Sequence, residues 1–257
     1  MEPKRITEYI IDWLKTYAED SGMGGFVVGV SGGIDSALTS TLCAKTGNPT
    51  VVISMPIHQD SNQLGRANNH ISFLLERHTN VSIHTVDLSL AFDTFQHSLP
   101  NEVADPLTMA NARARLRMAT LYAFAGNMKY LVAGTGNKVE DFGVGFFTKY
   151  GDGGVDLSPI ADLVKSEVRL CAESLGISQE ILNAKPTDGL WGDDRSDEDQ
   201  LGASYSELEW AMDFEGDEAD LTHREKEVLS IYQRLNTTNQ HKMNPIPVCV
   251  IPSELKH

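Results

Sequence analysis

Residues 27–40 have the sequence VVGVSGGIDSALTS, in which an apolar run passes through two adjacent glycines directly into helix-forming residues. The run FVVGV at 26–30 is short and continuous, which predicts a strand buried on both faces of a sheet. The glycines let the backbone approach a ligand without a Cβ atom in the way, and the start of a helix at 34–45 offers unpaired N–H groups to an anion. The segment therefore predicts a phosphate-binding loop after a buried strand.

Asp35 adds a constraint on the ligand of this loop. A carboxylate beside a phosphate repels it unless a cation lies between them, so the loop predicts a nucleotide together with Mg²⁺. It is not a Walker A loop, because no Gly-Lys-Ser/Thr follows, and it is not a GxGxxG dinucleotide fingerprint. The plainer alternative is a tight turn in which Asp35 only interacts favourably with the helix dipole. The strand before the loop and the serines at 31 and 36 favour the nucleotide site.

Strand and helix patterns alternate along most of the chain. The predicted strands are 26–30, 50–55, 81–86 and 129–135, and the predicted helices are 4–20, 34–45, 62–77, 107–126, 162–175, 201–213 and 223–235. Repeated strand–helix–strand units indicate an α/β fold with a doubly wound, mostly parallel sheet, helices on both of its faces and a helical C-terminal part. With no repeats and no low-complexity linker, residues 1–257 are predicted to form a single domain.

Composition and charge exclude several classes of protein. The chain has 257 residues and a formal net charge of −15, and the sequence pI is near 4.8. Phosphodiester backbones are repelled by such a surface, so we do not expect a nucleic-acid partner. No stretch has the ~18 uninterrupted apolar residues of a membrane span, and the N-terminus does not resemble a signal peptide. Cys43, Cys171 and Cys249 form no CxxC pair and are predicted to be buried, which favours the reducing cytoplasm.

The SGGxDS pattern of the loop resembles that of the ATP-pyrophosphatase-type enzymes. These enzymes cleave ATP between its α and β phosphates and activate a substrate oxygen as an adenylate; they include NAD synthetases, GMP synthetases and several tRNA-modifying enzymes. Two further segments, GTGNKVEDFGVGFFTKYGDGGVDLSPIADLVKSEV (134–168) and PTDGLWGDDRSDEDQLGASYSELE (186–209), narrow the resemblance to ammonia-dependent NAD synthetase. That resemblance implies an adenine nucleotide alpha hydrolase-like fold and the amidation of deamido-NAD with ATP and ammonia to give NAD, AMP and pyrophosphate, the last step of NAD biosynthesis.

The resemblance also implies a set of residues for ATP and its metal ion. Asp35 and Glu140 would hold Mg²⁺, and Asp35 and Lys165 would be the catalytic residues. The positions that match ATP contacts of the family are Gly29, Val30, Ser31, Gly32, Gly33, Ile34, Asp35, Ser36, Thr135, Lys165 and Thr187. Cations beside the reacting phosphates suit this chemistry, because a carboxylate that attacks an α-phosphate brings negative charge onto negative charge.

A second set matches the deamido-NAD site of the family. Its members are Arg115, Lys149, Asp156, His241 and Lys242. Helical spacing places Arg113 and Arg117 on one face and Arg115 across from them, so the choice of Arg115 rests on the resemblance. The positive residues of the set can meet the pyrophosphate of the dinucleotide. The acidic run at 193–199 has two possible interpretations, a solvated loop or a part of the active site.

Two alternatives and the expected partners complete the interpretation. The chain could be another ATP-pyrophosphatase-type ligase, such as a GMP synthetase-like enzyme, or a non-catalytic ATP-binding module; FFTKYGDGG argues against the first, and the retained pair of metal acids argues against the second. No glutaminase domain is expected within 257 residues, so free ammonia is the predicted nitrogen donor. Family members are homodimers, which implies a homodimer here.

Overall fold

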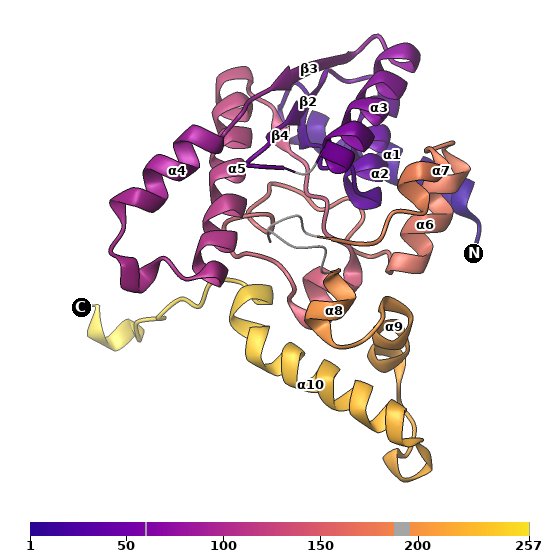
Figure 1. Cartoon of the computed structure of the whole chain (residues 1–257), viewed down its shortest axis with the longest axis vertical. Helices are drawn as coiled ribbons and strands as arrows, with labels where there is room; N and C mark the ends of the chain where they lie inside the picture. The colour runs from indigo at the N-terminus through magenta and orange to yellow at the C-terminus, as the bar shows by residue number, and fades with distance from the viewer. Residues whose placement is uncertain (60, 188–195, 257) are drawn as a thin grey trace.

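The computed structural model describes residues 1–59, 61–187 and 196–256. Its sheet has four parallel strands in the order β3-β2-β1-β4, seen in Figure 1 at the top of the molecule. The strands are β1 (Phe26–Gly29), β2 (Thr50–Ser54), β3 (Val81–Thr85) and β4 (Leu131–Val132). The chain builds outward from β1 to β3 and then returns to the other side of β1, so the direction of winding switches between β1 and β4. Ligands bind at such a switch point in open α/β sheets.

Both faces of β1 are covered, as its continuous apolar run predicts. Phe26, Val27 and Val28 are fully buried. Because side chains alternate along a strand, Phe26 and Val28 join the apolar cluster on one face of the sheet, while Val27 joins the cluster on the other. This arrangement holds the end of β1, and the loop that follows it, rigidly in the centre of the sheet.

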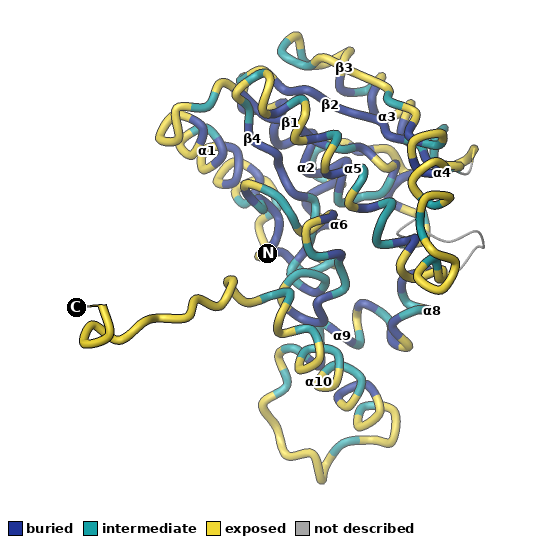
Figure 2. Tube along the Cα trace, turned by 90° about the vertical axis from the view of Figure 1, so that its left-hand side faces the viewer, coloured by how far each residue is buried: buried dark blue, intermediate teal, exposed yellow. Residues whose placement is uncertain are grey.

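Helices pack on the two faces of the sheet. One face is covered by α1 (Pro3–Ser21), α2 (Ile34–Lys45), α3 (Ser61–Arg77), α6 (Lys165–Ser174) and α7 (Gln179–Leu182), and the other by α4 (Ser89–Ser98) and α5 (Pro106–Met128). Figure 2 shows the buried strands between these layers. The predicted doubly wound α/β fold is therefore confirmed. No described helix is long and apolar enough to cross a membrane.

A helical part follows α7 and has an apolar cluster of its own. It contains α8 (Asp197–Leu201), α9 (Tyr205–Asp213) and α10 (His223–Met243), which pack on a π-helical segment, η2 (Val139–Val144). Short 3₁₀ turns lie at η1 (Asn101–Val103), η3 (Glu218–Asp220) and η4 (Ser253–Leu255). In Figure 1 these helices lie below the sheet, so the loops that join the two parts meet between them.

Some predicted boundaries are wrong, each for a visible reason. The strand expected at 129–135 is shorter, Leu131–Val132, and after it Ala133 forms only an isolated bridge with Leu157, while the Val132 N–H donates to the Asp156 carboxylate. The helix expected at 201–213 is divided at Gly202, whose φ of 82° ends α8. The Ser204–Glu207 capping box then starts α9.

Other differences follow from weak apolar patterns. The sequence predicted no helix at Ser89–Ser98, and α4 buries only Phe92. Helix α10 continues to Met243, past the predicted end at 235, through polar residues that bond to η2 carbonyls: Asn236 to Gly143 at 2.7 Å and Asn239 to Val144 at 2.8 Å. The expectation of buried cysteines is correct for Cys43 and Cys171 and wrong for Cys249, which is exposed in the C-terminal tail.

Candidate active site

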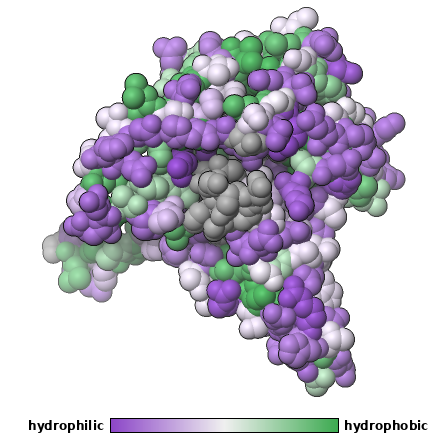
Figure 3. All heavy atoms as spheres, viewed as in Figure 1, coloured by the Kyte–Doolittle hydropathy of each residue, from purple (hydrophilic) through white to green (hydrophobic). Residues whose placement is uncertain are grey.

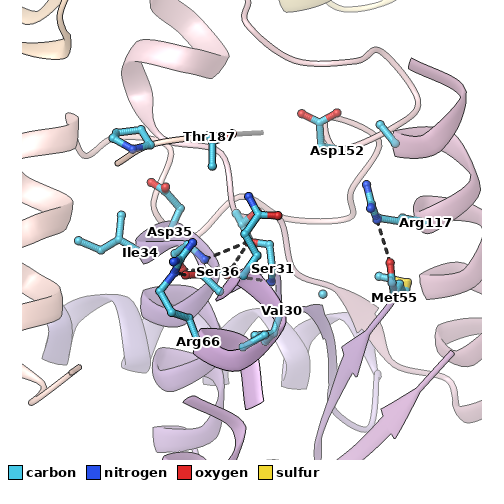
Figure 4. A pocket seen from close by; sticks show the side chains of 18 of the residues that line it. Val30, Ser31, Ile34, Asp35, Ser36, Met55, Arg66, Arg117, Asp152 and Thr187 are labelled. Carbon is cyan, nitrogen blue, oxygen red and sulfur yellow. Dashed lines mark hydrogen bonds between the residues drawn. The ribbon is translucent and has the colours of Figure 1, made fainter. Parts of the chain in front are cut away.

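A pocket of about 280 Å³ opens at the carboxyl ends of β1 and β4, at the switch point of the sheet. Every residue predicted to contact ATP lines it: Gly29, Val30, Ser31, Gly32, Gly33, Ile34, Asp35, Ser36, Thr135, Lys165 and Thr187. The second predicted metal acid, Glu140, lines it as well. The structure thus brings together four separate stretches of sequence that the analysis assigned to one nucleotide site. In Figure 4, Asp35 and Thr187 lie on one side of this pocket, and Asp152 and Arg117 on the other.

The loop after β1 is held in shape by its own serines. The Ser36 hydroxyl donates to the Gly33 carbonyl at 3.0 Å and accepts the Ser31 N–H at 3.3 Å, while the Ser31 hydroxyl accepts the Gly33 N–H at 3.2 Å. Gly32 has a φ of 85°, and a Cβ atom there would lie 2.6 Å from the Gln63 carbonyl oxygen. The α2 N-terminus that follows faces the pocket with its first N–H groups, which is the geometry of an anion site.

Lys165 is the cation that pairs with both predicted metal acids. Its Nζ lies 2.7 Å from Asp35 Oδ2 and 3.1 Å from Glu140 Oε1, and all three side chains are largely buried. Burial acts to lower the pKa of Lys165, but the two carboxylates outweigh it and hold this pKa above its ordinary value. Lys165 therefore stays charged, and it is the first residue of α6, in the lining of the pocket.

Asn137 is fully buried and connects the Asp35 carboxylate to the backbone of Glu140. Its Nδ2 donates to Asp35 Oδ1 at 3.1 Å, while its Oδ1 accepts the N–H groups of Val139 at 3.1 Å and Glu140 at 3.2 Å. The Asp35 and Glu140 oxygens converge on one point, since a single nitrogen already contacts both. Two carboxylates that share a cation between them suit Mg²⁺, which takes one or two protein carboxylates together with phosphate oxygens and water. The residues present therefore fit the predicted metal ion.

Comparison with known proteins assigns the chain to a family. The family model described as NAD synthase matches residues 6–246. The chain belongs to the NAD synthase family. The NH(3)-dependent NAD(+) synthetase of Alkaliphilus metalliredigens is 40% identical over 257 residues, covering 96% of this chain and 99% of that protein.

Solved structures agree with the assignment. The NMN synthetase of Francisella tularensis superposes with a TM-score of 0.86 and 30% identity, over 98% of this chain and 99% of that one. The NH3-dependent NAD synthetase of Campylobacter jejuni, in complex with the nitrate ion, gives a TM-score of 0.79 and 25% identity, over 97% of this chain and 100% of that one. This member of the NAD synthase family is therefore an enzyme that uses ATP, and the GMP synthetase-like and non-catalytic alternatives are not favoured.

Sequence reasoning missed several residues of the pocket of this NAD synthase family member. Arg117 reaches into it and donates to the Met55 carbonyl at 3.0 Å and to Gln59 Oε1 at 2.9 Å. Helical spacing grouped it with Arg113, yet Arg113 lies over the ring of Phe92, 4.3 Å from its centroid. Arg66 also lines the pocket and donates to the Gly32 carbonyl at 3.3 Å. The sequence signal for Arg117 was the spacing of Arg113, Arg115 and Arg117, which places them on two different faces of one helix.

Asp152 is an acid of the pocket that the sequence analysis did not single out. Its carboxylate accepts the Thr148 N–H at 3.0 Å. Although the residue opens onto the pocket, the surrounding protein removes water from the carboxyl and raises its pKa to about 6; the charge of Glu140 adds to this, and Thr148 and Lys242 oppose it. A carboxyl that titrates near neutrality can exchange a proton during a reaction.

The predicted deamido-NAD residues lie outside the pocket lining, and four of the five form one network. Arg115 donates to the Lys149 carbonyl at 3.2 Å, Lys149 donates to the His241 carbonyl, and Lys242 donates to the Phe147 carbonyl at 2.8 Å. This network ties the end of α10 to the segment that carries FFTKYGDGG.

The fifth predicted residue of this group has other partners. Asp156 accepts the Val132 N–H at 2.8 Å and the Tyr122 hydroxyl at 2.9 Å, so its side chain is used to hold the end of β4. Of the acidic run 193–199, residues 193–195 lie outside the described residues, while Asp197 is buried and lines the pocket.

Proposed function

We propose that this chain amidates deamido-NAD in two steps, with Asp35, Glu140 and Lys165 as the centre of the first. The nicotinate carboxylate attacks the α-phosphorus of ATP, the bond to the β-phosphate breaks, and pyrophosphate leaves. Ammonia then attacks the carbonyl carbon of the adenylate, loses a proton and expels AMP. The observation that carries the proposal is the Lys165 ammonium between two buried carboxylates, at the start of α6 and beside the α2 N-terminus.

The loop, Lys165, the two acids and two threonines of the pocket each contribute to the first step. The N–H groups in the first turn of α2, at 34–36, bind phosphate oxygens, and the ammonium of Lys165 neutralises charge that builds up as pyrophosphate leaves. Asp35 and Glu140 would hold Mg²⁺, which when bound supplies further positive charge to the phosphates. Thr135 and Thr187, which also line the pocket, add hydroxyl donors. No side-chain nucleophile is needed, because holding the two reactants in line does most of the work.

The network of Arg115, Lys149, His241 and Lys242 is proposed to bind the dinucleotide acceptor. On a chain with a net charge of −15, a local group of three cations is where a second pyrophosphate can bind. Asp156 is proposed to act with this network from the end of β4. Ammonia is the proposed nitrogen donor, and the relatives named NH(3)-dependent support it.

Assembly and location are part of the same proposal. We infer that residues 1–257 act as one synthetase domain, that two copies form a homodimer, and that the enzyme works in the cytoplasm. The exposed side of α5, with Ala119, Tyr122 and Ala123, and the exposed tail 244–256 offer surface for such a dimer. Figure 2 shows the tail extending away from the body of the molecule.

A second acceptor merits a test. The similarity to an NMN synthetase, with a TM-score of 0.86, favours a mononucleotide acceptor as the alternative to deamido-NAD. Both acceptors carry the nicotinate carboxylate, so the ATP half of the site would work in the same way on either.

The experiment measures AMP and amidated product from ATP, Mg²⁺ and one acceptor, with ammonium or glutamine as nitrogen source. We expect AMP and NAD to appear together with deamido-NAD and ammonium. Faster turnover of nicotinate mononucleotide would identify the second candidate. Amidation of XMP would support a GMP synthetase-like enzyme instead. ATP binding without AMP release in the presence of every acceptor would contradict the proposed function.

A further inference from the structure

Tyr205, the first residue of α9, reaches from the helical part into the ATP site. It is 5% exposed, and the base of its side chain belongs to the apolar cluster of α8, α9 and α10. Its hydroxyl lies 2.5 Å from Glu140 Oε1 and 3.4 Å from Asp197 Oδ2. One residue of the C-terminal half thus contacts an acid that is predicted to hold the metal ion.

The direction of the short hydrogen bond follows from the chemistry of the two groups. The phenol of Tyr205 carries one O–H donor, and the atom 2.5 Å from it is a carboxylate oxygen of Glu140. An ionised carboxylate has no proton to give. The hydroxyl therefore donates to Glu140 and holds that carboxylate in one orientation.

The ring of Tyr205 contacts the second charged group of the site. Lys165 Nζ lies over it, 4.6 Å from the ring centroid. An ammonium in this place is attracted by the negative face of the ring. Glu140 and Lys165, which are 3.1 Å apart, are thus held by the polar end and the face of one side chain.

A second residue of α9 contacts the start of α6, next to Lys165. Glu209 lies one turn after Tyr205, and its carboxylate accepts both the N–H and the hydroxyl of Ser166, at 2.8 and 2.7 Å. Ser166 follows Lys165 at the start of α6, where unpaired N–H groups need acceptors. Helix α9 therefore contacts the first turn of α6 through Glu209 and contacts Glu140 through Tyr205.

We propose that Tyr205 is a positioning residue for the ATP-dependent step, which aims the Glu140 carboxylate at the metal ion and keeps Lys165 beside the phosphates. This inference rests on the proposed function. Hydrogen-bond partners that orient a metal-bound carboxylate fix its geometry, and their removal typically weakens metal binding by about 10- to 100-fold. Tyr205→Phe removes this hydrogen bond and leaves the ring under Lys165 in place.

The test measures Mn²⁺ binding by electron paramagnetic resonance in the presence of α,β-methylene-ATP, an analogue that cannot be cleaved at the reacting bond. We expect Tyr205→Phe to weaken Mn²⁺ binding by about 10-fold and to raise the Mg²⁺ concentration for half-maximal activity, with the binding of metal-free analogue unchanged. Tyr232→Phe is the control, because Tyr232 packs on the same apolar cluster and its change also removes one hydroxyl. Thermal unfolding of both variants shows that the fold is kept.

Two results would overturn the positioning role of Tyr205. One is Mn²⁺ binding by Tyr205→Phe that equals that of Tyr232→Phe; the other is a loss confined to kcat at every Mg²⁺ concentration. If wild-type protein forms no AMP but binds Mn²⁺ and the analogue more tightly than Tyr205→Phe, the proposed function fails and the role of Tyr205 in metal binding stands. If wild-type protein binds no Mn²⁺ with the analogue, both are wrong.

Discussion

At the scale of single residues, the proposed reaction depends on the carboxylates of Asp35 and Glu140. Both acids face one ammonium within 3.1 Å, and Asn137 bonds to Asp35 and to the backbone of Glu140. Two carboxylates that converge on one point can hold a divalent cation there. We therefore expect Asp35→Asn or Glu140→Gln to lower the rate of amidation by at least ~10²-fold, as for the removal of a group that stabilises transition-state charge.

The measurement for these two variants is NAD formation at saturating ATP and acceptor. Glu173→Gln is the matched control, since Glu173 is an exposed acid of α6. Rates near that of wild type in both variants would contradict the assignment of the metal acids.

Asp152 predicts how the rate depends on pH. Loss of hydration and the charge of Glu140 raise its pKa to about 6, against the opposing effects of Thr148 and Lys242. Below this pKa the carboxyl is protonated and cannot take a proton from the incoming ammonium, and above it the carboxylate can. We expect kcat/KM to rise with pH through about 6, and Asp152→Asn to lower the rate and to remove this limb.

A pH profile of kcat/KM for wild type and variant tests this. Asp162→Asn, which changes an exposed acid paired with Lys138, should keep the limb. A limb near pH 6 that persists in Asp152→Asn would assign the titration to another group.

At the scale of elements, the loop between β1 and α2 depends on one backbone conformation. Gly32 has a φ of 85°, where a side chain costs roughly 1–2 kcal/mol, and its Cβ would also lie 2.6 Å from the Gln63 carbonyl. We expect Gly32→Ala to lower the free energy of unfolding by about 2 kcal/mol or more. Gly33→Ala, with an N-cap φ of −90° and its nearest neighbour at 3.4 Å, should change it little. Urea unfolding measures both, and equal stability of the two variants would contradict the argument.

At the scale of the whole molecule, exposed apolar residues point to a partner. Ile246, Val248 and Val250 are 65–82% exposed in a tail whose described residues from 244 to 256 are all exposed. Exposed apolar side chains gathered on one short segment are available to a partner. We expect the protein to sediment with twice its chain mass of 28.2 kDa, and deletion of 245–257 to weaken the dimer. Sedimentation velocity over a dilution series is the measurement, and a monomer at every concentration would contradict the proposed homodimer.

The sequence by itself determined the doubly wound parallel sheet, the glycine-containing loop after its first strand, and part of the pocket lining, namely residues 29–36, Thr135, Glu140, Lys165 and Thr187. These features are local: an apolar run, a pair of glycines and a helix start lie within 20 consecutive residues, and segments that resemble a known family carry the rest. Tertiary structure alone decided which other groups serve the site. Tyr205, Asn137, Arg117 and Asp152 act through contacts between elements far apart in the chain. Periodicity shows which face of an element is apolar, and the polar group that each residue meets across the core depends on how the elements pack.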